Sequence, residues 1–169
     1  MKKTKKRTAS SLPLDHPGRR RLPLLLRRSW FALNQAFRRR IASSGITPDQ
    51  FSLMRTLTEG PRKGMTQKDV MLAMSSDPNT IAALLARMEA AGLVERRPHE
   101  SDRRAHRVRL SRKGRRGYLR LRDVAIELQA EVLSALDATE RERFLAHLEI
   151  ISQACAQANL RSDGNSEPR

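Results

Sequence analysis

The first hydrophobic pattern along the chain predicts a helix from about Leu24 to Gly45. Its apolar members recur every three or four residues on one face: Leu26, Trp30, Leu33, Phe37 and Ile41. Two similar stripes lie nearer the C-terminus: Leu121, Val124, Leu128 and Val132, then Phe144, Leu148, Ile151 and Cys155. Each stripe needs an apolar partner to leave water. We therefore expect the segments 22–45 and 112–158 to be dimerisation helices, with a bundle inside one chain as the alternative.

Between these stripes, start and stop signals predict three shorter helices. Each begins with a residue whose side chain can accept a hydrogen bond from the first helical turn, and these residues are Thr47, Thr66 and Asp77. Proline follows Thr47 and Asp77, at the first helical position that proline favours. Glycines that suit a helix end, Gly60 and Gly92, follow the first and the last of these three helices.

Two short segments after Gly92 have the pattern of strands. VERRP and AHRVRL are joined by a loop over 98–104, which predicts a hairpin. Side chains alternate between the two faces of a strand, so Val108 and Leu110 are expected to point inward. The same alternation would place Arg107 and Arg109 on the open face.

The remaining signals are again helical. Ser111 suits the N-cap of a helix that runs to about Leu136, and a last helix is expected from Thr139 to about Ala158. The element order predicts a mainly α chain with a small β-hairpin between the fourth and fifth helices.

The charge of the chain is high and uneven. The 34 Lys and Arg residues outnumber the 18 Asp and Glu residues, giving a net charge of +16. Residues 1–40 hold 13 basic residues and 1 acidic residue, whereas residues 123–169 hold 4 and 9. A concentrated basic surface favours a polyanionic partner, nucleic acid before membrane. Residues 1–21 are expected to be a basic disordered arm that adds sequence-independent phosphate contacts, and residues 159–169 a disordered tail.

Several function classes are disfavoured by what the sequence lacks. Its one cysteine permits neither an intrachain disulfide nor a multi-cysteine zinc site. We expect Cys155 to pack in the stripe of the last helix rather than to sense oxidants. The four histidines show no metal-ligand spacing and no catalytic motif is present, so we expect no enzyme activity, no cofactor and no metal. No apolar run is long enough for a signal peptide or a membrane span, which indicates a cytoplasmic protein.

The helix over 77–91 has the two faces that a DNA-reading helix needs. Ile81, Leu84, Leu85 and Met88 form its buried stripe. On its other side, short side chains let the backbone approach base edges while polar groups read them. The candidate DNA-binding residues in and before this helix are Thr66, Gln67, Ser76, Asn79, Thr80, Ala83 and Arg87. An ordinary surface helix with an alanine-rich face is the alternative.

The hairpin adds a second candidate contact with DNA. Arg103 and Arg104 at its tip, with Arg107, suit the negative potential of a minor groove or phosphates. Asp102 beside them is expected to orient an arginine through a charge-assisted hydrogen bond. A solvated hairpin without a partner is the alternative.

The ordered combination resembles the MarR family of winged helix-turn-helix regulators. The resemblance rests on ITPDQFSLMRTL and MTQKDVMLAMSSDPNTIAALLARMEAAGLVERRPHESDRRAHRVRLSRKGR, and it covers roughly residues 22–158. It implies a winged helix-turn-helix DNA-binding domain over 46–111, a homodimer on a palindromic double-stranded operator, and repression relieved by a small aromatic, anionic or oxidising effector. It also implies that the 77–91 helix reads the major groove and that a tip arginine enters the minor groove.

An effector pocket is expected where the dimerisation helices meet the winged domain. Its candidate lining residues are Trp30, Phe31, Asn34, Phe51 and Arg55, for which core or salt-bridge roles are the alternative. Two other functions stay open from the sequence alone. One is nucleic-acid binding without sequence preference, and the other is binding of an acidic protein partner.

Overall fold

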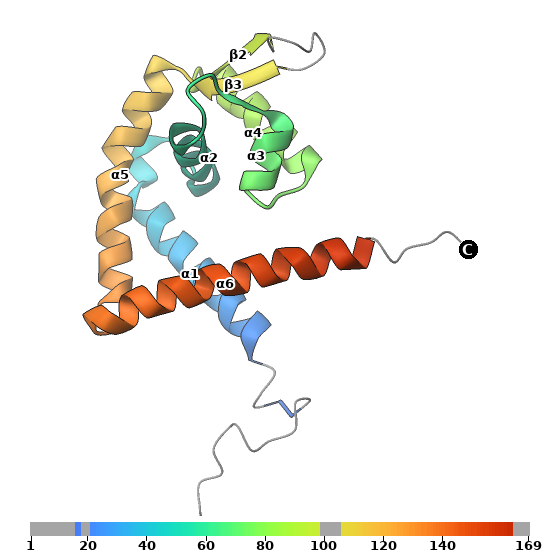
Figure 1. The fold of residues 1–169 in the computed structure, drawn as a ribbon. Coiled ribbons are helices and arrows are strands. Elements are labelled where there is room, and N and C mark those ends of the chain that lie inside the picture. The colour runs from blue at the N-terminus through green and yellow to red at the C-terminus, as the bar shows by residue number, and fades with distance from the viewer. Residues whose placement is uncertain (1–15, 18–20, 99–105, 164–169) are drawn as a thin grey trace, which may run out of the picture. The chain divides into compact units, whose positions relative to one another are not determined.

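The computed structural model describes residues 16–17, 21–98 and 106–163, with side chains described as far as 159. It confirms a mostly helical chain with a small β-sheet (Figure 1). The helices are α1 (Leu22–Arg40), the short 3₁₀ helix η2 (Ala42–Ser44), α2 (Pro48–Glu59), α3 (Gln67–Ala73), α4 (Pro78–Ala90), α5 (Arg112–Leu133) and α6 (Ala138–Asp163). The strands are β1 (Met65–Thr66), β2 (Val94–Pro98) and β3 (His106–Leu110).

The chain divides into two compact units. The first extends to Ala125 and contains the sheet and all helices up to the first part of α5. The second begins at Ile126 and contains the rest of α5 and α6. No helix of the described residues is long and apolar enough to cross a membrane.

The sheet has three antiparallel strands where the sequence predicted two. Its order is β1-β3-β2, so β3 is central. Val94 pairs with Leu110 on one side of β3, and Met65 pairs with Val108 on the other. β1 has only two residues, too few for an alternating pattern to show, which is why sequence reasoning missed it.

The core of the first unit joins α2, α3 and α4 to the sheet. Its largest fully buried side chains are Ile41, Leu53, Met54, Val70, Ile81, Leu85, Met88 and Val108. Aromatic rings extend this core toward α1 and α5, because Phe51 of α2 lies 4.9 Å from Phe37 and 5.6 Å from Tyr118 between ring centroids. α2, α3 and α4 are thereby packed below strands β2 and β3 in the view of Figure 1.

The predicted caps are present. The side chain of Thr47 accepts a hydrogen bond from the backbone N–H of Gln50, and that of Thr66 accepts one from Asp69. Ser111 accepts one from the N–H of Gly114, as a helix N-cap does.

Three helix ends differ from the sequence prediction. α1 ends at Arg40, and the left-handed Gly45, with φ 69°, instead ends the 3₁₀ turn η2. α5 ends at Leu133, short of the predicted Leu136. α6 continues to Asp163, so the tail predicted over 159–169 is wrong for its first part. A helix end that is predicted only from the loss of periodicity can be wrong by several residues, because a helix without a cap can extend or fray.

Much of the predicted apolar stripes is exposed in the single chain. In α1 only the end of the stripe, Phe37, is buried, whereas Trp30 is 63% exposed. In α6 the whole stripe is exposed, including Cys155, so the expected packing of this cysteine does not occur within the single chain. Exposed apolar residues on a protein surface are normally scattered, whereas here they follow one another along a helix face.

The start of α5 lies against the chain that leaves α4. A side chain at Gly114 would overlap the carbonyl oxygen of Leu93, which is backbone and cannot move aside. Alanine favours a helix by about 1 kcal/mol over glycine, but the overlap outweighs this gain.

We therefore expect Gly114→Ala to lower the free energy of unfolding by about 1–3 kcal/mol, as overpacked sites do. Chemical denaturation of the full chain measures this. Gly117→Ala in the same helix is the matched control, since its Cβ would meet only the ends of two flexible side chains, Ile46 Cδ1 at 3.1 Å and Met54 Cε at 3.9 Å. We expect the control to stay within about 1 kcal/mol of the wild type. Equal effects of the two variants would contradict this account of the junction.

Candidate nucleic-acid interface

Helix α4 has the two faces that its sequence predicts. Ile81, Leu85 and Met88 are fully buried, and Leu84 nearly so. The opposite face exposes Asn79, Thr80, Ala83 and Arg87 to solvent. The buried stripe fixes the rotation of the helix, so these four residues are presented together on one surface.

The first turn of α4 is held by its cap. A carboxylate oxygen of Asp77 accepts a hydrogen bond from the N–H of Thr80 at 2.9 Å. Hydrogen bonds from the hydroxyl and the backbone of Thr80 lower the pKa of Asp77 below its ordinary value of 3.8. Asp77 is therefore ionised at neutral pH and caps the helix that carries Asn79 and Arg87.

Helix α3 is attached to α4 at the same end. Thr66 and Asp69 form a reciprocal capping box, and the hydrogen bonds from Thr66 lower the pKa of Asp69. The amide of Gln67 also donates to the carbonyl of Pro78 at 3.5 Å, which links the first turns of α3 and α4. Three of the predicted DNA-binding residues are half-buried here. Thr66 and Gln67 lie at the start of α3, and Ser76 lies just before α4.

The turn between α3 and α4 contains a strained residue that the sequence did not reveal. Ser75 has φ 48°, the left-handed conformation that side chains other than those of Gly, Asn and Asp seldom adopt. Ser75 N–H donates to the carbonyl of Leu72 at 3.2 Å. A polar Ser-Ser-Asp run indicates a turn, but not which residue takes the positive φ.

The hairpin that follows α4 differs from its prediction at Arg107. This side chain is only 8% exposed, and its Nη1 donates to the carbonyl of Gly64 at 3.3 Å. The expectation that Arg107 lies on the open face is therefore wrong. Its predicted contact with DNA rested on that position and is not proposed further. The turn before β1 covers that side of β3, and nothing near Arg107 in the sequence indicates this long-range contact.

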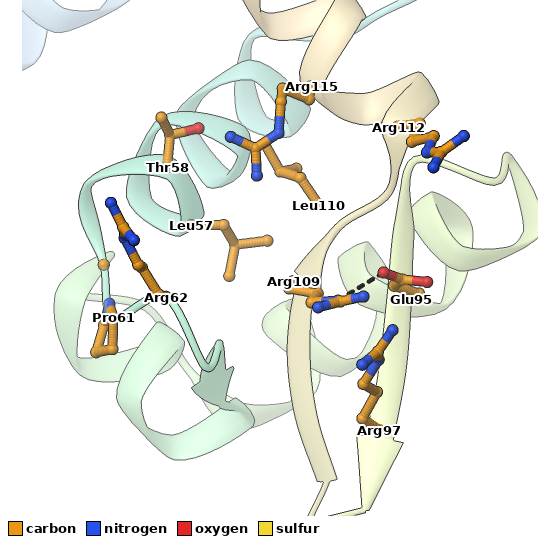
Figure 2. Close-up of a pocket in the computed structure, with 11 residues that line it drawn as sticks. Leu57, Thr58, Pro61, Arg62, Glu95, Arg97, Arg109, Leu110, Arg112 and Arg115 are labelled. Carbon is orange, nitrogen blue, oxygen red and sulfur yellow. Dashed lines mark hydrogen bonds and ion pairs between the residues drawn. The ribbon is translucent and has the colours of Figure 1, made fainter.

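Two other hairpin arginines, Arg109 and Arg96, pair with glutamates. Arg109 donates to Glu95, its cross-strand partner, at 2.6 Å (Figure 2). Arg96 pairs with Glu89 at 2.9 Å and so ties β2 to α4. The predicted tip residues Asp102, Arg103 and Arg104 lie outside the described residues.

A cavity of about 680 Å³ lies beside α4. Four of the five residues predicted to line an effector pocket line it, namely Trp30, Asn34, Phe51 and Arg55. The fifth, Phe31, does not line it and is exposed. Two residues of the exposed face of α4, Thr80 and Arg87, line the same cavity, which sequence spacing alone did not indicate.

The charges inside this cavity are partly matched. Arg55 donates a hydrogen bond to Glu59, one helical turn away, at 2.7 Å. This hydrogen bond raises the pKa of Arg55 above its ordinary value. Arg87, in contrast, has no ion pair within the described residues. The guanidinium available for an anion in this cavity is therefore that of Arg87. Among the described residues, no group of three or more His, Cys, Asp or Glu could hold a metal ion.

The chain is similar to known regulators in sequence and in fold. The family model described as MarR family matches residues 44–105. The transcriptional regulator HosA of Escherichia coli O127:H6 is 32% identical over 100 residues, which cover 59% of this chain and 73% of HosA.

Solved structures show the same fold. The transcriptional repressor CouR, bound to a 23-mer DNA duplex, is 27% identical with a TM-score of 0.71, over 83% of this chain and 98% of CouR. The Staphylococcus aureus MepR–DNA complex has a TM-score of 0.73 at 22% identity, over 78% of this chain and 96% of MepR. With the helix-turn-helix and the three-stranded sheet described above, these similarities show that the chain belongs to the MarR family of winged-helix transcriptional regulators.

Proposed function

We propose that the chain acts as a homodimeric repressor that binds a palindromic double-stranded DNA operator and releases it when a small molecule binds. The observation on which this rests is the exposed face of α4, where Asn79, Thr80, Ala83 and Arg87 lie together above a fully buried stripe. A role in transcription also places the protein in the compartment that holds DNA, which we propose is the cytoplasm. We propose no catalytic activity.

The roles of single residues follow from their places. Asn79 and Arg87 read base edges in the major groove, and the small Ala83 allows close approach. Thr66, Gln67 and Ser76, at the start of α3 and before α4, contact phosphates. For the tip of the hairpin, the sequence-based proposal stands that Arg103 or Arg104 enters the minor groove and Asp102 orients it. The DNA-binding domain is proposed to extend over 46–111.

DNA titration with α4 variants tests base reading. At fixed salt, the wild type should bind a palindrome from its own upstream region at least about 1,000-fold more tightly than random duplex. Asn79→Ala and Arg87→Ala should each lose about 1–3 kcal/mol on the palindrome and little on random duplex. Arg120→Ala, an exposed arginine of α5, is the control for charge. A wild-type ratio near one would instead favour binding without sequence preference, the alternative that the net charge of +16 supports.

Dimerisation is proposed for the helices 22–45 and 112–158 because their apolar faces are exposed. Both Trp30 and Phe31 of α1 are more than half exposed, as is Ile150 of α6. A symmetric dimer would cover such faces and place two copies of α4 on one palindrome.

Sedimentation equilibrium on the full chain should give twice the chain mass of 19.2 kDa. Ile151→Arg, in the α6 stripe, should shift the protein to the monomer without unfolding it, because Ile151 is exposed in the single chain. Gln153→Arg, on the opposite side of α6, should leave the dimer intact. A monomeric wild type, or equal effects of the two variants, would contradict the assignment of this face.

The effector is proposed to bind in the cavity beside α4. Trp30 and Phe51 offer aromatic surfaces to a planar molecule, and Arg87 offers a guanidinium to its carboxylate. A molecule bound there would engage the Arg87 side chain, which α4 is proposed to use on DNA. Arg87 could then no longer contact a base, which is how effector binding would release the operator.

Benzoate is a suitable probe because Trp30 is the one tryptophan of the chain and its fluorescence reports on the cavity. Titration in the absence of DNA should give a saturable fluorescence change. Arg87→Ala should weaken benzoate binding about tenfold or more, the loss expected for a charge-assisted hydrogen bond. Arg116→Ala, an exposed arginine that lines neither this cavity nor the one on the sheet, should bind benzoate as the wild type does. Binding that is unchanged in Arg87→Ala would refute this role of Arg87.

A further inference from the structure

A second cavity, of about 850 Å³, opens on the sheet and shares no lining residue with the cavity beside α4. Its lining residues are Leu57, Thr58, Gly60, Pro61, Arg62, Glu95, Arg97, Arg109, Leu110, Arg112 and Arg115. They come from the end of α2 and the turn after it, from β2 and β3, and from the start of α5 (Figure 2). None of them belongs to α3 or α4, so this surface is distinct from the proposed DNA-reading face.

The charge of this cavity is strongly positive. Five of its lining residues are arginines and one is a glutamate. Glu95 is already paired with Arg109 at 2.6 Å, which leaves the other four guanidiniums without a carboxylate among the described residues. Like charges gathered in this way repel one another, so an anion that binds among them relieves that repulsion.

The backbone holds these arginines around one space. Gly64 N–H donates to the carbonyl of Pro61 at 2.8 Å, closing the turn that carries Arg62. Arg112 and Arg115 lie on the first turn of α5, whose N-terminal dipole also favours negative charge. Figure 2 shows Arg62 and Arg115 on two sides of Leu57, whereas the Arg109 side chain extends toward Glu95.

The floor of the cavity is apolar and already formed. Leu57 and Leu110 are buried beneath the arginines, and the hydroxyl of Thr58 donates to the carbonyl of Met54 at 2.8 Å. Guanidinium groups are therefore the main polar groups that a ligand meets. Their planar, bidentate geometry matches phosphate. Four positive charges that have no carboxylate partner in the described part of the chain match several phosphates better than one carboxylate.

We propose that this cavity binds the phosphates of a small polyphosphate anion, whether a free polyphosphate or the polyphosphate end of a nucleotide. Its volume is in the range of small-molecule sites. The ligand would bridge α2, the sheet and the start of α5, all of which belong to the first unit. This proposal does not depend on effector binding beside α4.

Isothermal titration of the full chain with tripolyphosphate, at about 150 mM salt to screen exposed charge, tests the proposal. We expect one saturable site per chain. Arg112→Gln combined with Arg115→Gln should weaken binding about tenfold or more, since two charge-assisted contacts are lost. Arg116→Gln combined with Arg120→Gln removes the same charge from the same helix outside the cavity, and it should change the affinity by no more than about twofold. Unsaturable binding, or equal weakening in both double variants, would show a general response to net charge and overturn the site.

A second measurement distinguishes a small anion from the DNA backbone as the source of phosphate. The salt dependence of binding to random duplex falls by about one unit of slope for each phosphate contact removed. We expect the two double variants to have the same slope on duplex. A slope lower by about one or two units only in the Arg112→Gln, Arg115→Gln variant would assign the cavity to the DNA backbone and overturn the proposal of a small anion.

Discussion

The contact between the end of α4 and the start of α5 determines how the rest of the first unit is arranged. The hydroxyl of Ser111 donates to the carbonyl of Gly92 at 2.6 Å and accepts from the N–H of Gly114 at 3.0 Å. Lys113 donates to the carbonyl of Ala91 at 2.8 Å. One short segment thus provides hydrogen-bond partners for the carbonyls of Ala91 and Gly92, just after α4, and for the N–H of Gly114 in the first turn of α5. The absence of a side chain at Gly114 lets the two backbones approach each other this closely.

Because of this junction, helix α4, which is proposed to read DNA, and helix α5, which is proposed to take part in dimerisation, share a common support. α4 is fixed at its other end by the Asp77 cap and along its length by Ile81 and Leu85. The pair between Glu89 and Arg96 adds a connection to β2. A helix held at both ends and along one face presents its exposed residues in a constant geometry, which sequence-specific binding requires.

Sequence could predict the features that depend on local chemistry. The caps at Thr47, Thr66, Asp77 and Ser111 are correct because each forms hydrogen bonds within three residues. The features that sequence missed depend on distant contacts. Arg107 is buried by a hydrogen bond to Gly64, 43 residues away. The pairing of Arg55 with Glu59 could have been predicted, because residues four apart on a helix are neighbours. That Arg87 and Trp30 line the same cavity could not be predicted, because it depends on how α1, α2 and α4 pack.

Arg87 lies at once on the exposed face of α4 and in the wall of the neighbouring cavity. Under the proposed roles, this one side chain takes part in recognising both the DNA sequence and the effector. A substitution at this position that adapts the protein to a new effector also alters the DNA sequences it prefers, so the two specificities cannot diverge independently through Arg87. Relatives that change effector while keeping their operator are expected to do so through residues of α1 and α2, such as Trp30 and Asn34, that line the cavity without facing DNA.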